Sequence, residues 1–137
     1  MATHTTSPTR TSTTHVLRRS LQANGIFSSV SGIILIAGAV PITSFLGLSS
    51  PIILVVIGAV VLLYAASLFM AAARRTIDRR TGFRYATIDA AWVLGSVVLL
   101  LTNWVPFTTA GKWSVALAAL IVAIFAGLQC YGAWRTT

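Results

Sequence analysis

Four long apolar segments dominate this chain, and no other feature constrains its fold as much. They cover residues 21–40, 51–73, 86–105 and 113–134. A run of about 20 apolar residues, at about 1.5 Å rise per residue, matches the roughly 30 Å hydrocarbon core of a bilayer. Lipid offers no partner to an unpaired backbone N–H or C=O group, so each segment is expected to be a helix. The predicted fold is therefore an all-α integral membrane bundle of four transmembrane helices.

The basic residues lie almost entirely on one side of these four segments. Of ten lysines and arginines, only Lys112 lies on the other side. The net charge of +8 does not indicate nucleic-acid binding, because the basic residues cluster at helix ends and form no polar face. The positive-inside rule instead places both termini in the cytoplasm. The size of the chain and its charge bias indicate the inner membrane of a bacterium. Seven arginines are expected to contact lipid head groups: Arg18, Arg19, Arg74, Arg75, Arg79, Arg80 and Arg84.

Domain organisation follows from composition. Residues 1–15 are rich in threonine and serine, and are predicted to form a disordered cytoplasmic tail. Residues 16–137 form a single transmembrane domain, with short outer loops at about 41–50 and 106–112. The only cysteine, Cys130, falls inside the fourth segment, so no disulfide forms within the chain.

The two halves of the chain resemble each other at an offset of 65 residues. This offset aligns Asn24 with Asp89, and the segment 40–44 (VPITS) with 105–109 (VPFTT). The pattern predicts two duplicated transmembrane hairpins, related by an axis along the membrane normal.

Asp89 is the one acidic residue within the apolar segments. A carboxylate at the bilayer centre costs about 2.5–3.5 kcal/mol on insertion scales, so something must offset that cost. On one interpretation, Asp89 pairs with Arg84, Arg18 or Arg19 and locks the helices together. On the other, Asp89 is a functional site. The sequence leaves both open.

Each of the other three helices brings polar residues to the depth of Asp89. Because their distances from the basic helix ends are similar, these groups are predicted to form one hydrogen-bonded cluster that opens to the cytoplasm. Trp92 lies one turn from Asp89 on the same face, where packing is the alternative role. The candidate ligand- or ion-binding residues are Asp89, Asn24, Gln129, Tyr64, Ser67 and Trp92.

Small residues recur at a spacing of four along the helices, as is common where membrane helices approach closely. The residues predicted to pack in this way are Gly25, Ser28, Gly32, Ala91, Gly95, Ala123 and Gly127.

The pattern of residues argues against several function classes. The apolar segments hold one carboxylate, no histidine and no lysine, so neither a catalytic pair nor a metal or cofactor site is expected. Small four-helix multidrug exporters carry their essential acid on the first helix, where this chain has Asn24. The segments LRRSLQANGIFSSVSG and DAAWVLGS are similar to those of small bacterial four-helix membrane proteins, a resemblance that implies no activity.

The leading functional prediction is a non-enzymatic membrane protein. It would pack against other copies or other membrane subunits, or bind a lipid or small apolar ligand in the polar layer. The alternative is a small transporter or proton-coupled channel that uses Asp89. That alternative lacks a polar path, because the outer halves of the helices are almost wholly apolar.

Overall fold

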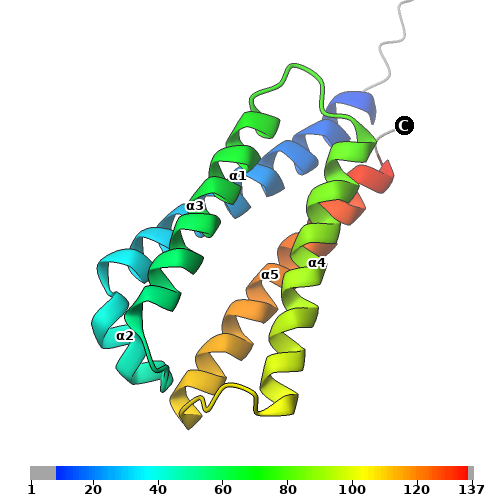
Figure 1. The fold of residues 1–137 in the computed structure, drawn as a ribbon. Coiled ribbons are helices and arrows are strands. Elements are labelled where there is room, and N and C mark those ends of the chain that lie inside the picture. The colour runs from blue at the N-terminus through cyan, green and yellow to red at the C-terminus, as the bar shows by residue number, and fades with distance from the viewer. Residues whose placement is uncertain (1–8, 136–137) are drawn as a thin grey trace, which may run out of the picture.

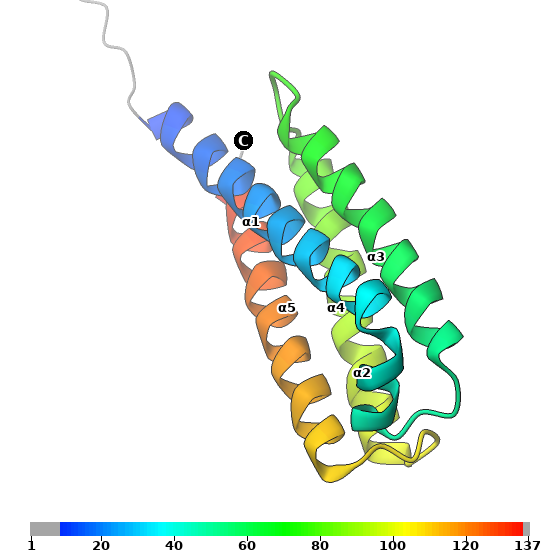
Figure 2. The same ribbon diagram turned by 90° about the vertical axis from the view of Figure 1, so that its left-hand side faces the viewer.

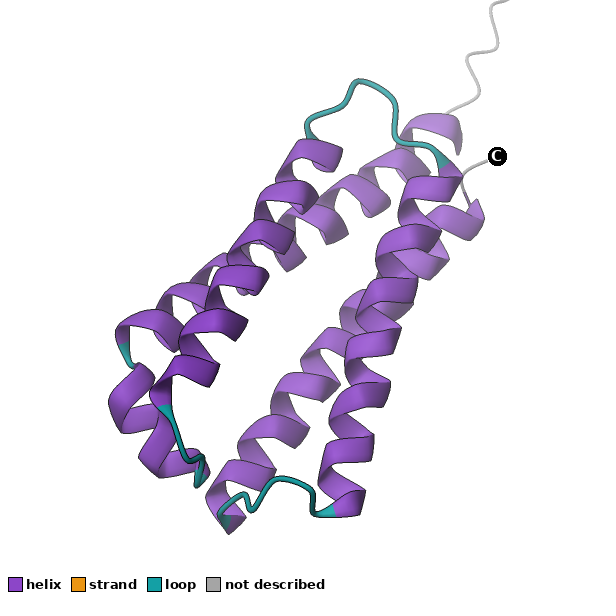
Figure 3. Cartoon of the chain, viewed as in Figure 1, coloured by secondary structure: helices purple, strands orange, loops and turns teal. Residues whose placement is uncertain are grey.

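The computed structural model describes residues 9–135, with side chains from residue 15 onward. In this part of the chain the structure is entirely helical and has no strand (Figure 3). The five helices are α1 (Thr9–Ala37), α2 (Ala39–Leu46), α3 (Pro51–Ala72), α4 (Arg79–Thr102) and α5 (Thr109–Arg135). Four are long, and α2 is a short addition that the sequence did not predict.

The four long helices, α1, α3, α4 and α5, are each long and apolar enough to cross a membrane. Large hydrophobic side chains also cover the outside of the bundle. Leu63 on α3 and Leu101 on α4, for example, are 74% and 77% exposed. An outer surface of this kind matches lipid rather than water. The predicted membrane four-helix architecture is therefore supported.

The long helices are arranged as two hairpins. α1 packs along α3, α4 packs along α5, and α1 also contacts α5 (Figures 1 and 2). By contrast, α3 and α4 are not among the closely packed helix pairs of the described chain. Both ends of the described chain lie near the α3–α4 loop, and α2 lies at the other end of the bundle (Figure 1). We call the first the arginine-rich end, after Arg19, Arg74, Arg75, Arg79, Arg80 and Arg84.

The first apolar segment is not one continuous helix up to residue 40, and residues 41–50 are not all loop. α1 ends at Ala37, a turn follows at Gly38, and α2 contains Pro41. The physical reason is the proline, whose ring clashes with the carbonyl four residues earlier, that of Ala37. In the first turn of the new helix α2, Pro41 is tolerated because its missing N–H needs no partner there.

The N-terminal helix begins earlier than the composition indicated. Residues 9–15 belong to α1, although the sequence placed them in a disordered tail; residues 1–8 lie outside the described part. Extending an existing helix fixes one residue at a time, so a polar continuation outside the membrane costs little. For the same reason α4 starts at Arg79 and α5 at Thr109, before the apolar runs.

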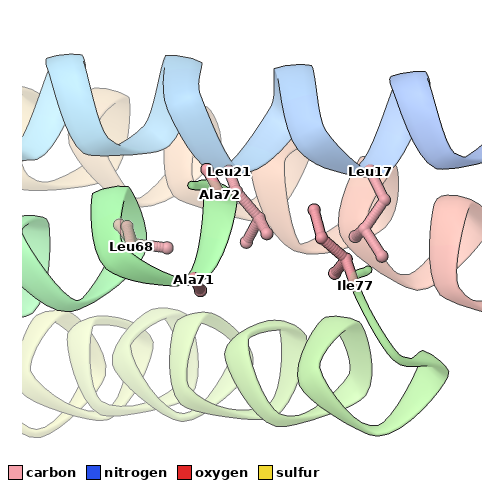
Figure 4. Packing of buried hydrophobic residues seen from close by; sticks show 6 residues of the cluster. All are labelled: Leu17, Leu21, Leu68, Ala71, Ala72 and Ile77. Carbon is pink, nitrogen blue, oxygen red and sulfur yellow. The ribbon is translucent and has the colours of Figure 1, made fainter. Parts of the chain in front are cut away.

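A compact hydrophobic cluster lies toward the arginine-rich end of the bundle. It brings together the buried side chains of Leu17, Leu21, Leu68, Ala71, Ala72 and Ile77 (Figure 4). Tyr64 and Tyr85 pack against this cluster. The hydrophobic cluster therefore lies next to the predicted polar cluster, to which Tyr64 belongs.

Small residues pack closely where α1 crosses α3. A Cβ atom added at Gly32 would lie 2.9 Å from the carbonyl oxygen of Gly58, and one added at Gly58 would lie 2.9 Å from that of Gly32. Gly25 lies against the ring of Phe69, and Ser28 is buried. These predicted packing residues on α1 do lie at a helix contact.

The predicted packing residues on α4 and α5 do not share this role within the chain. Ala91, Gly95 and Gly127 are exposed, and Cβ atoms added at the two glycines would meet no atom within 4 Å. Ala123 is half-buried. The spacing alone did not distinguish faces directed inward from faces directed outward.

Candidate ligand-binding site

Asp89 lies near the middle of α4, with only 3% of its surface exposed. Its Oδ2 accepts a hydrogen bond of 2.7 Å from Nδ2 of Asn24 on α1. Its Oδ1 accepts one of 2.7 Å from the hydroxyl of Tyr64 on α3. The carboxyl group therefore ties three helices together, as the shared depth of these residues predicted.

No basic residue among those described pairs with Asp89, so the interpretation in which Asp89 forms an ion pair with Arg84, Arg18 or Arg19 does not hold. Arg84 is exposed. Arg18 instead donates to the carbonyl oxygens of Ala72, Arg74 (2.9 Å) and Arg75 (3.3 Å). Those carbonyls lie at the end of α3 and directly after it, where a cation also meets the negative end of the helix dipole. Arg18 thus caps α3, and its expected contact with lipid head groups stays a prediction.

The two donors to Asp89 are held in place by further contacts. Ser28 donates to Oδ1 of Asn24 at 3.2 Å, which orients the amide so that its nitrogen faces Asp89. The ring of Tyr64 packs against that of Tyr85, with centroids 5.8 Å apart. Tyr85 in turn donates to the backbone oxygen of Ser67 at 2.9 Å. α1, α3 and α4 all contribute to this support.

Two predicted members of the cluster are not hydrogen-bonded to Asp89. The Ser67 hydroxyl donates to the backbone oxygen of Tyr64 in its own helix. Gln129 is fully buried on α5, and its amide lies near the Asp89 carboxyl. However, neither Oε1 nor Nε2 of Gln129 has a hydrogen-bond partner in the described part of the chain. The structure therefore joins three of the predicted polar groups and leaves Gln129 buried beside them.

A cavity of about 350 Å³ begins at Asp89 and runs between all four long helices. One part of its wall is polar and belongs to Asn24, Ser28, Ser31, Tyr64 and Asp89. The rest is apolar and includes Ile34, Leu35, Val60, Val61, Ala118 and Val122. Most of these apolar residues lie closer to the α2 end than the polar ones. The cavity is therefore amphiphilic, with a short polar part and a longer apolar part.

Aromatic rings complete the wall near the carboxyl group. Phe27 on α1 and Trp92 on α4 line the cavity together with Tyr64. Phe27 packs against Phe125 of α5, with ring centroids 5.7 Å apart. Trp92 was predicted as a candidate. Phe27 and Tyr85 were not, although Phe27 lies three residues after Asn24 on the same helical face.

The polar groups do not open toward the arginine-rich end, in contrast to the sequence-based expectation. Leu21 lies one turn beyond Asn24 on that side, and Leu68 one turn beyond Tyr64. Both belong to the hydrophobic cluster of Figure 4. Apolar side chains therefore lie between Asp89 and the basic surface.

Comparison with protein-family models, with curated proteins and with solved structures gives no match. Within the described residues, no group of three or more histidine, cysteine, aspartate or glutamate side chains gathers in one place. The functional argument therefore depends on the cavity and on the chemistry of its walls.

Proposed function

We propose that this chain is a non-enzymatic, multi-pass membrane protein that binds a small amphiphilic or apolar molecule in the cavity between its helices. The observation that carries the proposal is a cavity of about 350 Å³ whose wall includes the buried Asp89 carboxyl group. Small-molecule sites are mostly apolar, measure roughly 300–1,000 Å³ and hold a few well-placed polar groups. The cavity has each of these properties.

Entry from the lipid is part of this proposal. Val60 on α3, and Ile88 and Trp92 on α4, line the cavity and are 56%, 42% and 47% exposed. α3 and α4 do not pack closely against each other, and Figure 1 shows them apart. An apolar molecule dissolved in the bilayer reaches the cavity sideways, between these helices.

The transmembrane orientation is proposed from charge. Seven exposed arginines of the described chain lie at one end of the bundle, the six that name it and Arg135, so the positive-inside rule puts that end in the cytoplasm. Exposed tryptophans occur at both ends, where membrane interfaces favour them: Trp134 at the arginine-rich end, and Trp104 and Trp113 at the α2 end.

Internal duplication is proposed from contacts between residues 65 positions apart. Asn24 bonds to its counterpart Asp89. A Cβ atom added at Gly82 would lie 3.1 Å from Leu17, and one added at Gly111 would lie 3.0 Å from the Leu46 oxygen. Residues at equivalent positions of the two hairpins therefore approach each other at the arginine-rich end, in the middle and at the α2 end of the bundle. An axis along the membrane normal, between the two hairpins, would produce this pattern.

Transport remains the second candidate, because Asp89 is buried and pairs with no basic residue in the described part of the chain. The surroundings of the site favour binding over transport. Hydrophobic residues separate Asp89 from the arginine-rich end, and the cavity wall toward the α2 end is apolar. Neither side offers an ion or a proton a polar path.

A fluorescence experiment tests the proposed binding. Replacing Trp104, Trp113 and Trp134 by phenylalanine leaves Trp92 as the only tryptophan, beside the cavity. In nanodiscs of zwitterionic lipid, 8-bromo-1-octanol is expected to quench Trp92 in a saturable way. A protein that keeps only Trp113 should show quenching that merely rises in proportion to the alcohol dissolved in the lipid.

A cavity-filling substitution supplies the decisive comparison. Ala118→Phe places a ring in the apolar part of the cavity and should abolish the saturable component. Ala59→Phe is the matched control, because Ala59 is exposed, does not line the cavity and lies about as far from the α2 end. Quenching that never saturates, or that Ala118→Phe leaves unchanged, would overturn the proposed function.

A further inference from the structure

Asp89 has hydrogen-bonding capacity that its neighbours do not use. A carboxylate offers about four lone-pair sites, and each of its oxygens accepts one hydrogen bond here. Both donors, the Asn24 amide and the Tyr64 hydroxyl, are neutral. The carboxyl group also lines the cavity, so its remaining capacity faces the space that a ligand fills.

The charge of this carboxylate has no counterpart in the described structure. A buried charge without a partner is costly, so the group must take up either a proton or a cation. Arg18, the half-buried arginine of α1, donates its hydrogen bonds to carbonyls at and after the end of α3. A cation must therefore come from outside the chain.

Three aromatic residues from three helices surround the same part of the cavity: Phe27, Tyr64 and Trp92. The face of an aromatic ring attracts a cation within about 6 Å, and more strongly where water is excluded. The ring contacts with Phe125 and Tyr85 hold Phe27 and Tyr64 in place. A carboxylate combined with aromatic walls is the chemistry that recognises an alkylammonium group.

We propose that the occupant of the cavity is a single-chain lipophilic cation, whose ammonium head group lies at Asp89 and whose apolar tail extends toward the α2 end. This inference rests on the proposed binding function and names the ligand class. A monoanion would face the carboxylate unfavourably. A purely apolar ligand would supply no counter-charge, so Asp89 would then have to keep a proton.

Cation and proton compete for the same carboxyl group. When a quaternary ammonium ion binds, the Asp89 carboxyl group loses its proton to solvent, and one positive charge replaces another. Tyr64 on α3, with Tyr85 of α4 behind it, is the other titratable group that faces this site. α1 and α5 present the neutral Asn24, Ser28 and Gln129, and no described arginine or lysine faces Asp89.

The test compares two probes that differ in head-group charge, using the protein in which Trp92 is the only tryptophan. The probes are 8-bromooctyltrimethylammonium and neutral 8-bromo-1-octanol, in nanodiscs of zwitterionic lipid. The cation is expected to bind more tightly than the alcohol. Its apparent affinity should fall as the pH is lowered, approaching about tenfold per pH unit where Asp89 is protonated. In that pH range, binding in weak buffer should release one proton per site.

Asp89→Asn should weaken binding of the cation about tenfold or more and leave the alcohol little changed. The pH series and the proton count use the unsubstituted carboxyl group, so they test the idea even if that variant folds poorly. Saturable binding of the alcohol, with no preference for the cation and no pH dependence, would overturn the cation inference and keep the proposed function. Failure of both probes to bind saturably would overturn both.

Discussion

Asp89 is positioned by hydrogen bonds rather than by charge. The Asn24 and Tyr64 donors reach its two oxygens from different helices, each at 2.7 Å. Neutral donors stabilise the carboxylate without cancelling its charge, in contrast to a salt bridge. The residue is thus fixed in place by neutral groups, with no counter-charge among the described residues.

The Tyr64 hydroxyl tests how much this arrangement contributes to stability. Tyr64→Phe keeps the ring against Tyr85 but removes the hydrogen bond to Asp89. We expect a loss of about 1–2 kcal/mol in the free energy of unfolding, seen as a lower melting temperature in detergent. Tyr131→Phe is the control, because Tyr131 is exposed. Equal melting temperatures for the two variants would mean that the Tyr64 bond contributes nothing.

Gln129 differs from Tyr64, because it is a buried polar residue whose amide atoms have no hydrogen-bond partner among the described residues. Gln129→Leu removes this unsatisfied amide and keeps a side chain of similar size. We expect the free energy of unfolding to rise by about 1–2 kcal/mol. Gln22→Leu, at an exposed position of α1, should change it little. A lower melting temperature for Gln129→Leu would show that the amide stabilises Asp89 after all.

Among the helices, α1 and α3 approach each other closely at a crossing that depends on two glycines. A Cβ atom at Gly58 would lie 2.7 Å from Cγ1 of Ile36 and 2.9 Å from the Gly32 oxygen. Backbone atoms cannot move aside as a flexible side chain can. This crossing places the α1 and α3 walls of the cavity at a fixed separation.

Gly58→Ala is therefore expected to force the two helices apart. The cost should be about 1–3 kcal/mol in the free energy of unfolding, measured by thermal melting in detergent. Gly95→Ala on α4 supplies the control, because its new Cβ atom would meet nothing within 4 Å. We expect that control to melt within error of the unsubstituted protein. Similar losses for both variants would contradict the close crossing.

The break between α1 and α2 shows what an apolar run conceals. Residues 32–42 carry no polar side chain, so hydropathy gives no reason to end a helix at Ala37. The sequence places Pro41 in the loop that follows the first apolar segment. Its ring instead ends one helix four residues earlier and is accommodated in the first turn of the next. Both arrangements satisfy the proline, and only the structure distinguishes them.

At the scale of the whole molecule, the sequence predicted the bundle because bilayer thickness sets the length of each helix, so that the number of long apolar runs gives the number of helices. It also predicted the meeting of Asn24, Tyr64 and Asp89, since depth is counted in residues from the basic ends. The rotation of each helix about its axis was harder to predict. Gly32 and Gly95 have similar sequence surroundings, yet one faces a neighbouring helix and the other faces open space. The sequence did not predict that Arg18 caps α3. An arginine near a helix end has the same sequence surroundings whether it caps a neighbouring helix or contacts lipid head groups.

The proposed orientation of the molecule is tested by labelling single cysteines. In a Cys130→Ser background, Ser49→Cys marks the α2 end and Thr76→Cys marks the loop at the arginine-rich end. A membrane-impermeant maleimide on intact cells should label only the Ser49→Cys variant. The Thr76→Cys variant should react after the membrane is permeabilised. The reverse pattern would invert the topology, and labelling of both in intact cells would mean that the chain inserts in two orientations.

Two consecutive residues near the start of α1 connect all three other long helices. Leu17 fills the space that Gly82 of α4 and Gly132 of α5 leave open, and Arg18 caps α3. During synthesis, α1 is translated before the helices that contain the partners of these residues. α5 is the last of these partners to be made. The bundle therefore cannot close at its arginine-rich end until α5 has been synthesised.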